Sequence, residues 1–282
     1  MPSRSEAANE EVITPNLLRR WPLPNPQGDK ETRGTVLVVG GSRTTPGAVL
    51  LAGVAALRAG AGRLQLAAEA STAAALSIAV PEAKVIGLPD DDQLAGLAAE
   101  ADVVAIGPGL DDIDDTIRLM RRVLGVAAED SAVVLDAYAL GALSKEPGLL
   151  AGIAERAVLT PNVTEAEVLL GHKPGDDLAG ATRTLADLFR TTVCLYGHIA
   201  APDGRCWREE SGDAGLGTSG SGDVRAGIVA GLLARGCDAA QAACWGTFAH
   251  AVSGQRLAPR YGRTGFLARE LVDEVAYTIA TV

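Results

Sequence analysis

From Thr35 onward, short apolar runs of strand length alternate with helix-length segments. This alternation predicts an α/β fold, in which a mostly parallel central sheet carries helices on both faces. Ligands of such sheets bind outside the carboxyl ends of the strands, so we expect the chemistry in the loops that follow them. The predicted strands are Thr35–Val39, Arg63–Ala68, Val85–Leu88, Val103–Ile106, Val133–Asp136 and Val158–Thr160.

The pattern changes after a further predicted strand, Thr192–Tyr196. The turn-forming segment Ala201–Arg205 separates two short strand candidates and predicts a hairpin, so we expect antiparallel strands there. Three helices are predicted to close the chain, over Asp223–Arg235, Ala239–Leu257 and Ala268–Ile279.

The first 33 residues are polar and rich in proline. Within them, Thr14–Leu18 has the pattern of a capped helical turn with Pro15 at its first position. We predict a partly ordered N-terminal arm over residues 1–33 and a single domain over residues 34–282, because no linker or repeat divides the remainder.

The charge and apolar content of the chain exclude several classes of partner. A formal net charge of −10 without a basic patch argues against nucleic acid. The longest uncharged apolar stretch, Ala48–Leu57, is about half of the ~20 residues that a membrane span needs. No signal-peptide pattern precedes it and the four cysteines form no CxxC pair, so we predict a cytoplasmic protein with reduced, packing cysteines.

The strongest local signal is the segment Gly217–Asp223, which leads directly into an apolar helix. Small residues at a helix N-terminus let backbone N–H groups approach a phosphate. A carboxylate there repels the anion, so Asp223 makes better sense as a base beside a transferring phosphoryl group. The motif fits equally well a structural helix entry in which Asp223 is only a stabilising first-turn acid.

Two further glycine-dense turns follow predicted strands. They are Val39–Ser42, together with Pro46–Ala48, and Ile106–Leu110. Neither matches a Walker loop or a GxGxxG fingerprint. Combined with the late glycine-rich helix entry, they predict a sheet edge that accepts two phosphate-bearing ligands.

The order of these motifs resembles the ADP/ATP-dependent NAD(P)H-hydrate dehydratase family of the ribokinase-like superfamily, and the resemblance runs from about Gly34 to the C-terminus. It implies a ribokinase-like three-layer sandwich and a hydro-lyase, for which residues 34–282 are the catalytic domain. The segments that carry it are Gly40–Ser42, Gly47–Ala48, Leu57–Gly62, Pro81–Glu82, Ile106–Gly109, Leu135–Ala137, Leu159–Pro161, Glu165 and Gly220–Asp223.

In such an enzyme a nucleotide, ADP or ATP, phosphorylates the hydroxyl of hydrated NADH or NADPH, and phosphate then leaves. The resemblance implies that Asp223 is the base and that the N–H groups of Gly220, Ser221 and Gly222 hold the phosphoryl group. It places Ala48 and Gly109 at the hydrated dinucleotide. It also implies Mg²⁺ between the phosphates, with no protein ligand that the sequence identifies, and a homo-oligomer for which a tetramer is one candidate.

Several residues depart from the family pattern. Asn162, which the resemblance places at the substrate, stands where His is usual. Tyr196-Gly197-His198, at the nucleotide, stands where Lys-Gly-Ala is usual, and Asp213 stands where Asn is usual. A protonated His198 would partly replace the missing lysine, whereas the alternative is an ordinary hydrogen-bonded surface histidine. We expect these changes to affect nucleotide binding more than the catalytic base.

Other charged candidates have simpler interpretations. The acidic runs Asp90–Asp92 and Asp111–Asp115 are predicted to be solvated helix starts, and His172 and His250 to be structural. Two alternative functions stay open at this point. One is a ribokinase-like kinase that phosphorylates an alcohol, and the other is a catalytically impaired nucleotide-binding homologue.

Overall fold

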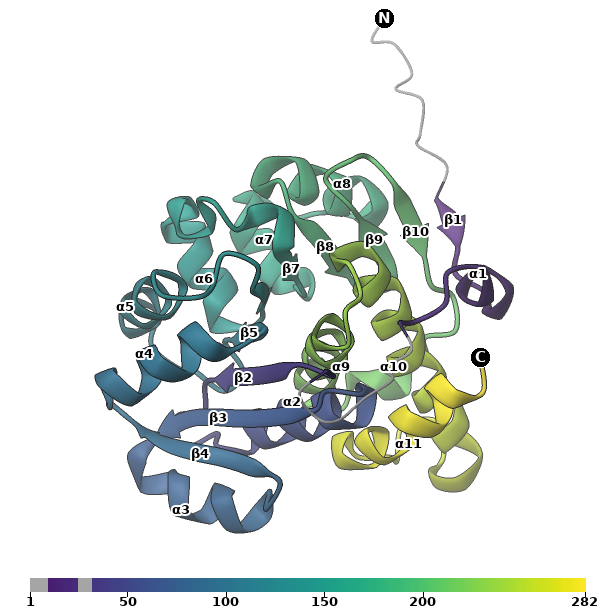
Figure 1. The fold of residues 1–282 in the computed structure, drawn as a ribbon. Helices are drawn as coiled ribbons and strands as arrows, with labels where there is room; N and C mark the ends of the chain where they lie inside the picture. Colours follow the sequence, from purple (N-terminus) through teal and green to yellow (C-terminus); the bar gives the residue numbers. More distant parts are fainter. Residues whose placement is uncertain (1–9, 25–31) are drawn as a thin grey trace, which may run out of the picture.

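A ten-stranded sheet is the middle layer of this computed structural model, which describes residues 10–24 and 32–282 (Figure 1). The strand order is β4-β3-β2-β5-β6-β7-β8-β9-β10-β1, parallel from β4 to β8, with β9 antiparallel to both neighbours and β1 parallel to β10. The strands are β1 Glu11–Val12, β2 Thr35–Val39, β3 Arg63–Glu69, β4 Ala83–Leu88, β5 Val103–Ile106, β6 Ala132–Leu135, β7 Ala157–Leu159, β8 Thr192–Leu195, β9 His198–Ala200 and β10 Cys206–Arg208.

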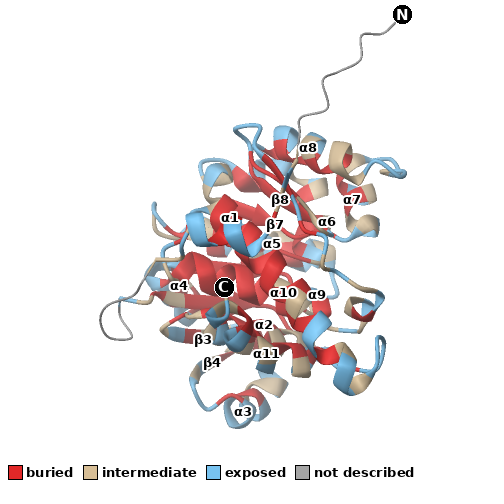
Figure 2. Ribbon diagram, turned by 90° about the vertical axis from the view of Figure 1, so that its right-hand side faces the viewer, coloured by how far each residue is buried: buried red, intermediate tan, exposed pale blue. Residues whose placement is uncertain are grey.

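Helices cover both faces of the sheet, as predicted. Helices α4 to α8 pack on one face, and α1 to α3 with α9 to α11 pack on the other, so that buried residues form two cores (Figure 2). The helices are α1 Pro15–Arg20, α2 Gly47–Ala59, α3 Ala70–Ala79, α4 Asp91–Glu100, α5 Ile113–Leu124, α6 Tyr138–Lys145, α7 Val163–Leu170, α8 Leu178–Phe189, α9 Ser221–Ala234, α10 Ala239–Tyr261 and α11 Ala268–Ala280.

The central strands are apolar throughout because both of their faces are buried. In β2, Val36 and Val38 belong to one core, whereas Leu37 and Val39 belong to the other. Successive side chains of a strand point to opposite faces, so a strand between two helical layers needs apolar residues at every position. This explains why β2 and β5 have the bounds predicted from sequence.

Several predicted boundaries shift by one or two residues, among them those of β3, β4, β6, β7 and β8, and two helix boundaries bear on the site or the packing. Helix α9 begins at Ser221 rather than at Asp223, which makes Asp223 its third residue. Helix α10 does not end at Leu257 but continues through Pro259 to Tyr261. A proline removes one backbone hydrogen bond, which a helix tolerates more easily in its last turn than at its centre. The predicted hairpin is confirmed, because β9 and β10 pair antiparallel around the turn.

Helices α2 and α9 lie in backbone contact, and this contact positions the N-terminus of α9, where the predicted phosphate-binding segment lies. A Cβ atom on Gly227 would lie 2.1 Å from Ala52 O, and one on Gly231 would lie 2.2 Å from Ala56 O. Only glycine permits such an approach. The N-terminal turns of the two helices are therefore neighbours, and Leu51 of α2 reaches Gly220 at the start of α9.

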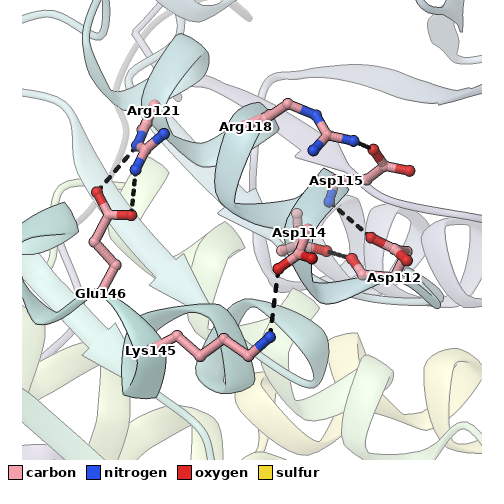
Figure 3. Close-up of polar contacts among 8 residues, drawn as sticks. Asp112, Asp114, Asp115, Arg118, Arg121, Lys145 and Glu146 are labelled. Carbon is pink, nitrogen blue, oxygen red and sulfur yellow. Dashed lines mark hydrogen bonds and ion pairs between the residues drawn. The ribbon is translucent and has the colours of Figure 1, made fainter.

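The acidic runs are helix starts with ordinary partners, as predicted. Asp112 caps α5 by accepting a hydrogen bond from Asp115 N at 2.8 Å (Figure 3). Asp114 pairs with Lys145 at 3.3 Å, and Asp90 caps α4 in the same way. Such carboxylates stabilise the positive end of the helix dipole and need no metal.

The described part of the N-terminal arm packs on the body. Strand β1 extends the sheet, and Thr14 caps α1 with Pro15 at the first position, which confirms the predicted helical turn. Arg19 Nε donates to Val282 O at 2.7 Å, so α1 and the end of the chain lie side by side (Figure 1). Arm residues 1–9 and 25–31 lie outside the described residues. Among the helices of the described ranges, none is both long and apolar enough to cross a membrane.

Candidate active site

Helix α9 begins without a side-chain cap. Its N-cap residue, Gly220, has a φ of +85° and supplies no capping side chain. Ser221 N donates to Thr218 O at 3.2 Å, so that N–H group already has a partner. The N–H groups of Gly222 and Asp223, in the first turn, have no acceptor within the helix. Of the amides predicted to hold the phosphoryl group, that of Ser221 is thus already paired, whereas that of Gly222, with the amide of Asp223 beside it, has a favourable dipole for an anion. Binding of a phosphate there stays a prediction.

The two glycines at the start of α9 differ. Gly220 cannot be replaced without a clash, whereas Gly222 is next to open space. A Cβ on Gly220 would lie 2.5 Å from Leu51 Cδ1, in a backbone conformation that side chains rarely adopt. A Cβ on Gly222 would meet nothing within 4 Å. The backbone at Gly222 is thus accessible to a ligand, whereas Gly220 holds the turn.

A cavity of about 790 Å³ opens beside these amides. Its volume is within the range of ~300–1,000 Å³ that is usual for small-molecule sites. It brings together Asn162, Tyr196, Gly197, Ser221 and Gly222, which are five of the predicted site residues. The other lining residues are Val163, Thr164, Glu209, Glu210, Gly212, Asp213, Ala214, Leu216, Gly217, Thr218, Arg225, Thr247, His250 and Ala251.

Ala48 and Gly109 lie together, but they do not line this cavity. A Cβ on Gly109 would lie 2.9 Å from Ala48 Cβ, and Ser42 N donates to Gly109 O at 2.7 Å. The loops after β2 and β5 are thereby tied to each other. The residues predicted to bind the substrate therefore lie in two places. Ala48 and Gly109 are outside the cavity, whereas Asn162 lines it together with the residues predicted to bind the nucleotide.

Asp223 lies on the side of α9 that faces α2. Its Oδ2 is 3.7 Å from the position of a Cβ on Gly220, where Leu51 also approaches. Ala48 stands one turn before Leu51 on α2. Asp223 is therefore near the Ala48 end of the site, whereas Gly222, one residue earlier, faces the cavity.

The three residues at the end of β8 have different surroundings. Tyr196 has a φ of +52° and a largely exposed side chain. Gly197 is required, because a Cβ there would lie 2.4 Å from Glu209 O. His198 is absent from the cavity lining, and its Nδ1 lies 2.8 Å from Glu10 Oε1 of the N-terminal arm. A nucleotide contact of His198 stays a prediction.

Three carboxyl groups, of which Asp136 is buried and Glu165 and Asp223 are partly buried, have raised pKa values. Burial raises the pKa of Asp136, although Thr160 donates a hydrogen bond to it at 2.7 Å. Burial and the charge of Asp136 raise the pKa of Glu165 to about 7. Burial, with the charges of Asp136 and Glu165, raises the pKa of Asp223 to about 7. A carboxyl group with such a pKa can accept a proton at neutral pH, as a general base must.

Two residues that line the cavity, Arg225 and His250, had no predicted part in ligand binding. Arg225 donates from Nη2 to Thr160 O at 2.7 Å. The sequence signal for it was that Arg225 is, apart from Asp223, the only charged residue of an apolar helix. His250 Nε2 lies 2.8 Å from Ser221 Oγ, so the prediction of a satisfied, buried histidine is confirmed. Burial lowers the pKa of His250 to about 3, which keeps it neutral.

The extra negative charge of Asp213 has a partner. Arg263 donates to its two carboxylate oxygens at 2.7 and 2.9 Å. These hydrogen bonds lower the pKa of Asp213, which therefore stays ionised and paired at the edge of the cavity. Its charge disfavours a phosphate less than that of an unpaired carboxylate would.

Within residues 10–24 and 32–282, no three His, Cys, Asp or Glu side chains form a group that could hold a metal ion. The four cysteines, Cys194, Cys206, Cys237 and Cys244, are all free and buried, as predicted.

Comparison with known proteins identifies the family. The sequence profile of the NAD(P)H-hydrate dehydratase family matches residues 36–276. The chain is 46% identical to the ADP-dependent (S)-NAD(P)H-hydrate dehydratase of Xanthomonas campestris over 283 residues, which cover 94% of both proteins.

Solved structures have the same fold. An ADP/ATP-dependent NAD(P)H-hydrate dehydratase of Bacillus subtilis, co-crystallised with ATP and Mg²⁺, is 27% identical with a TM-score of 0.81 and covers 97% of this chain and 99% of its own. A ribokinase-like superfamily protein of Enterococcus faecalis, 21% identical, has a TM-score of 0.86 and covers 100% of this chain and 98% of its own. The chain has a ribokinase-like fold and belongs to the NAD(P)H-hydrate dehydratase family.

Proposed function

We propose that this chain is a hydro-lyase that uses ADP or ATP to dehydrate hydrated NADH or NADPH through a phosphorylated intermediate. The family to which it belongs favours this function over a kinase with a stable product. The observation that carries the proposal is a carboxyl group with a pKa of about 7, on Asp223, beside the uncapped first turn of α9.

In this proposal the nucleotide occupies the 790 Å³ cavity and its phosphates reach the amides of Gly222 and Asp223. The hydrated dinucleotide enters from the side of Ala48 and Gly109. Asp223 takes the proton of the substrate hydroxyl while the hydroxyl oxygen bonds to the terminal phosphorus of the nucleotide. The bond from that phosphorus to its bridging oxygen breaks at the same time, so AMP leaves from ADP, or ADP from ATP. The carbon–oxygen bond then breaks, the ring loses a proton, and phosphate departs as a better leaving group than hydroxide.

We include Mg²⁺ in the proposal, because the Bacillus subtilis relative was crystallised with it. Glu165 and Asp223 are suitable oxygen donors. Burial and the charge of Asp136 raise the pKa of both, and the charge of Glu165 further raises that of Asp223, so a cation would relieve this repulsion. Mg²⁺ is commonly held by one or two carboxylates with phosphates and water. The ion would supply charge neutralisation at the phosphates.

The test is turnover by the purified protein. Hydrated NADH supplied with ADP or ATP should regain reduced-nicotinamide absorbance as nucleotide is consumed. A stable phosphoester in place of that absorbance would indicate the kinase. Nucleotide binding without any turnover would indicate a catalytically impaired homologue.

The pH dependence of kcat/KM should report Asp223. We expect the rate to fall about tenfold per pH unit below a midpoint near the pKa of about 7, because only the ionised base accepts a proton. Glu165→Gln should move this midpoint to lower pH, since it removes a charge that raises the pKa of Asp223. Glutamine also preserves the capping box with Asn162. An unchanged midpoint would exclude coupling between the two carboxylates.

The proposal also covers the compartment, the oligomeric state and the domain organisation of the enzyme. We propose a cytoplasmic homo-oligomer, with a tetramer as one candidate, without membrane or nucleic-acid partners. We further propose that residues 34–282 are the catalytic domain and residues 1–33 an arm. The buried, free cysteines and the net charge of −10 support the compartment and the absence of nucleic acid. Light scattering of the purified protein measures the oligomer.

A further inference from the structure

The cavity beside α9 has an acidic wall. Glu209, Glu210 and Asp213 all line it. Two of them form ion pairs with arginines that do not line the cavity: Glu210 pairs with Arg208, and Asp213 pairs with Arg263. Glu209 instead accepts hydrogen bonds from Ser211 N and Gly212 N, at 2.8 and 3.1 Å. An anionic ligand in this cavity therefore requires a compensating positive charge.

Arg225 supplies that charge. In the part of the chain that the structure describes, it is the only lysine or arginine among the lining residues. It stands two residues after Asp223 on α9, close to the first-turn amides. Its guanidinium lies at the ends of β7 and β8, where Nη2 donates to Thr160 O at 2.7 Å and Nη1 to Tyr196 O at 3.4 Å.

The hydrogen bonds of Arg225 are incomplete. Its Nε is buried and has no hydrogen-bond partner. The bond from Nη1 to Tyr196 O, at 3.4 Å, is longer than the usual ~2.7–3.2 Å. A buried donor without an acceptor costs free energy, and native proteins leave few of them. Nη2 donates to Thr160 O and, at 3.3 Å, to Pro161 O, so it is Nη1, with its single long bond, that retains capacity for a further acceptor.

We propose that Arg225 is a nucleotide-binding residue whose guanidinium contacts the phosphates of the adenine nucleotide and offsets the acidic wall. This inference rests on the proposed function only for the identity of the ligand as ADP or ATP. Arginine suits the role, because it stays charged and can donate several hydrogen bonds to phosphate oxygens.

Calorimetric titration with ADP tests the proposal without turnover. Arg225→Met should weaken ADP binding by about 10- to 100-fold, the usual effect of losing a hydrogen bond to a charged group. Arg118→Met is the control, because Arg118 is an exposed arginine of α5 that pairs with Asp115. The control should bind ADP as the wild type does.

A second variant separates charge from structure, because Arg225 also ties together the ends of β7 and β8. Tyr196 lines the same cavity, so Tyr196→Lys in the Arg225→Met background returns a cation to it. We expect this double variant to regain most of the lost affinity. Unchanged ADP affinity in Arg225→Met, or no recovery in the double variant, overturns the proposal.

The outcome is independent of the dehydratase assay. A wild-type protein that dehydrates hydrated NADH, with an Arg225→Met variant of normal ADP affinity, keeps the proposed function and removes Arg225 from it. If the wild-type protein shows no turnover but its ADP binding depends on Arg225, the role of Arg225 is kept and the proposed dehydratase function is removed.

Discussion

We expect Asp223→Asn to slow the dehydration of hydrated NADH by about 100- to 10,000-fold, the usual contribution of a positioned general base. Asparagine has nearly the same shape but cannot accept the hydroxyl proton. The measurement is kcat with nucleotide and substrate at saturation, at a pH above the Asp223 pKa of about 7. ADP affinity should not fall, because the first-turn amides stay in place.

The same change should stabilise the fold at high pH. Asp223 has a pKa of about 7 in the folded protein against 3.8 without burial, so between these values the folded state binds more protons than the unfolded state. The contribution of Asp223 to stability therefore decreases as pH rises through this window. Asn avoids that loss, and we expect a gain on the order of 2 kcal/mol at pH 8 and little difference at pH 4.

Asp203→Asn is the matched control for the effect on the rate. Asp203 lies in an exposed turn, where it accepts hydrogen bonds from Arg205 N at 3.0 Å and Arg205 Nε at 2.7 Å. The control should retain the wild-type rate. An Asp223→Asn enzyme as fast as the wild type would remove Asp223 from the mechanism.

The architecture of this protein could be predicted because its signals are local. The apolar run Thr35–Val39 is a buried strand by its own composition, and the turn-forming segment before β10 predicts its hairpin. The start of α9 could be located only approximately. Ser221 and Gly222 belong to the helix although their helix propensities are weak, so local sequence does not indicate its first residue.

The site was predictable only in part, because its contacts are long-range. His198 meets Glu10, which is 188 residues away, and Arg263 meets Asp213 from a loop 50 residues later. No local pattern indicates either pairing. Arg225 carried a signal, a charge in an apolar helix, but its acceptors at the ends of β7 and β8 are known only once the sheet is assembled.

Gly222→Val should abolish nucleotide use while leaving the fold intact. A Cβ at this position meets nothing within 4 Å outside its own helix backbone and chain neighbours, so we expect the protein to accept the new side chain. It would occupy the space through which a phosphate reaches the amides of α9. We expect ADP binding to weaken by about 100-fold or more, because each lost hydrogen bond to a charged group contributes ~1.5–3 kcal/mol.

The unfolding temperature of Gly222→Val should be unchanged or higher, because glycine is a poorer helix former than valine. Gly96→Val is the control: Gly96 lies within α4, on the opposite face of the sheet, and its Cβ would also meet nothing within 4 Å. It should keep wild-type ADP affinity. Normal ADP affinity in Gly222→Val would mean that the phosphates do not approach the first turn of α9, and the anion site would have to be sought elsewhere in the cavity.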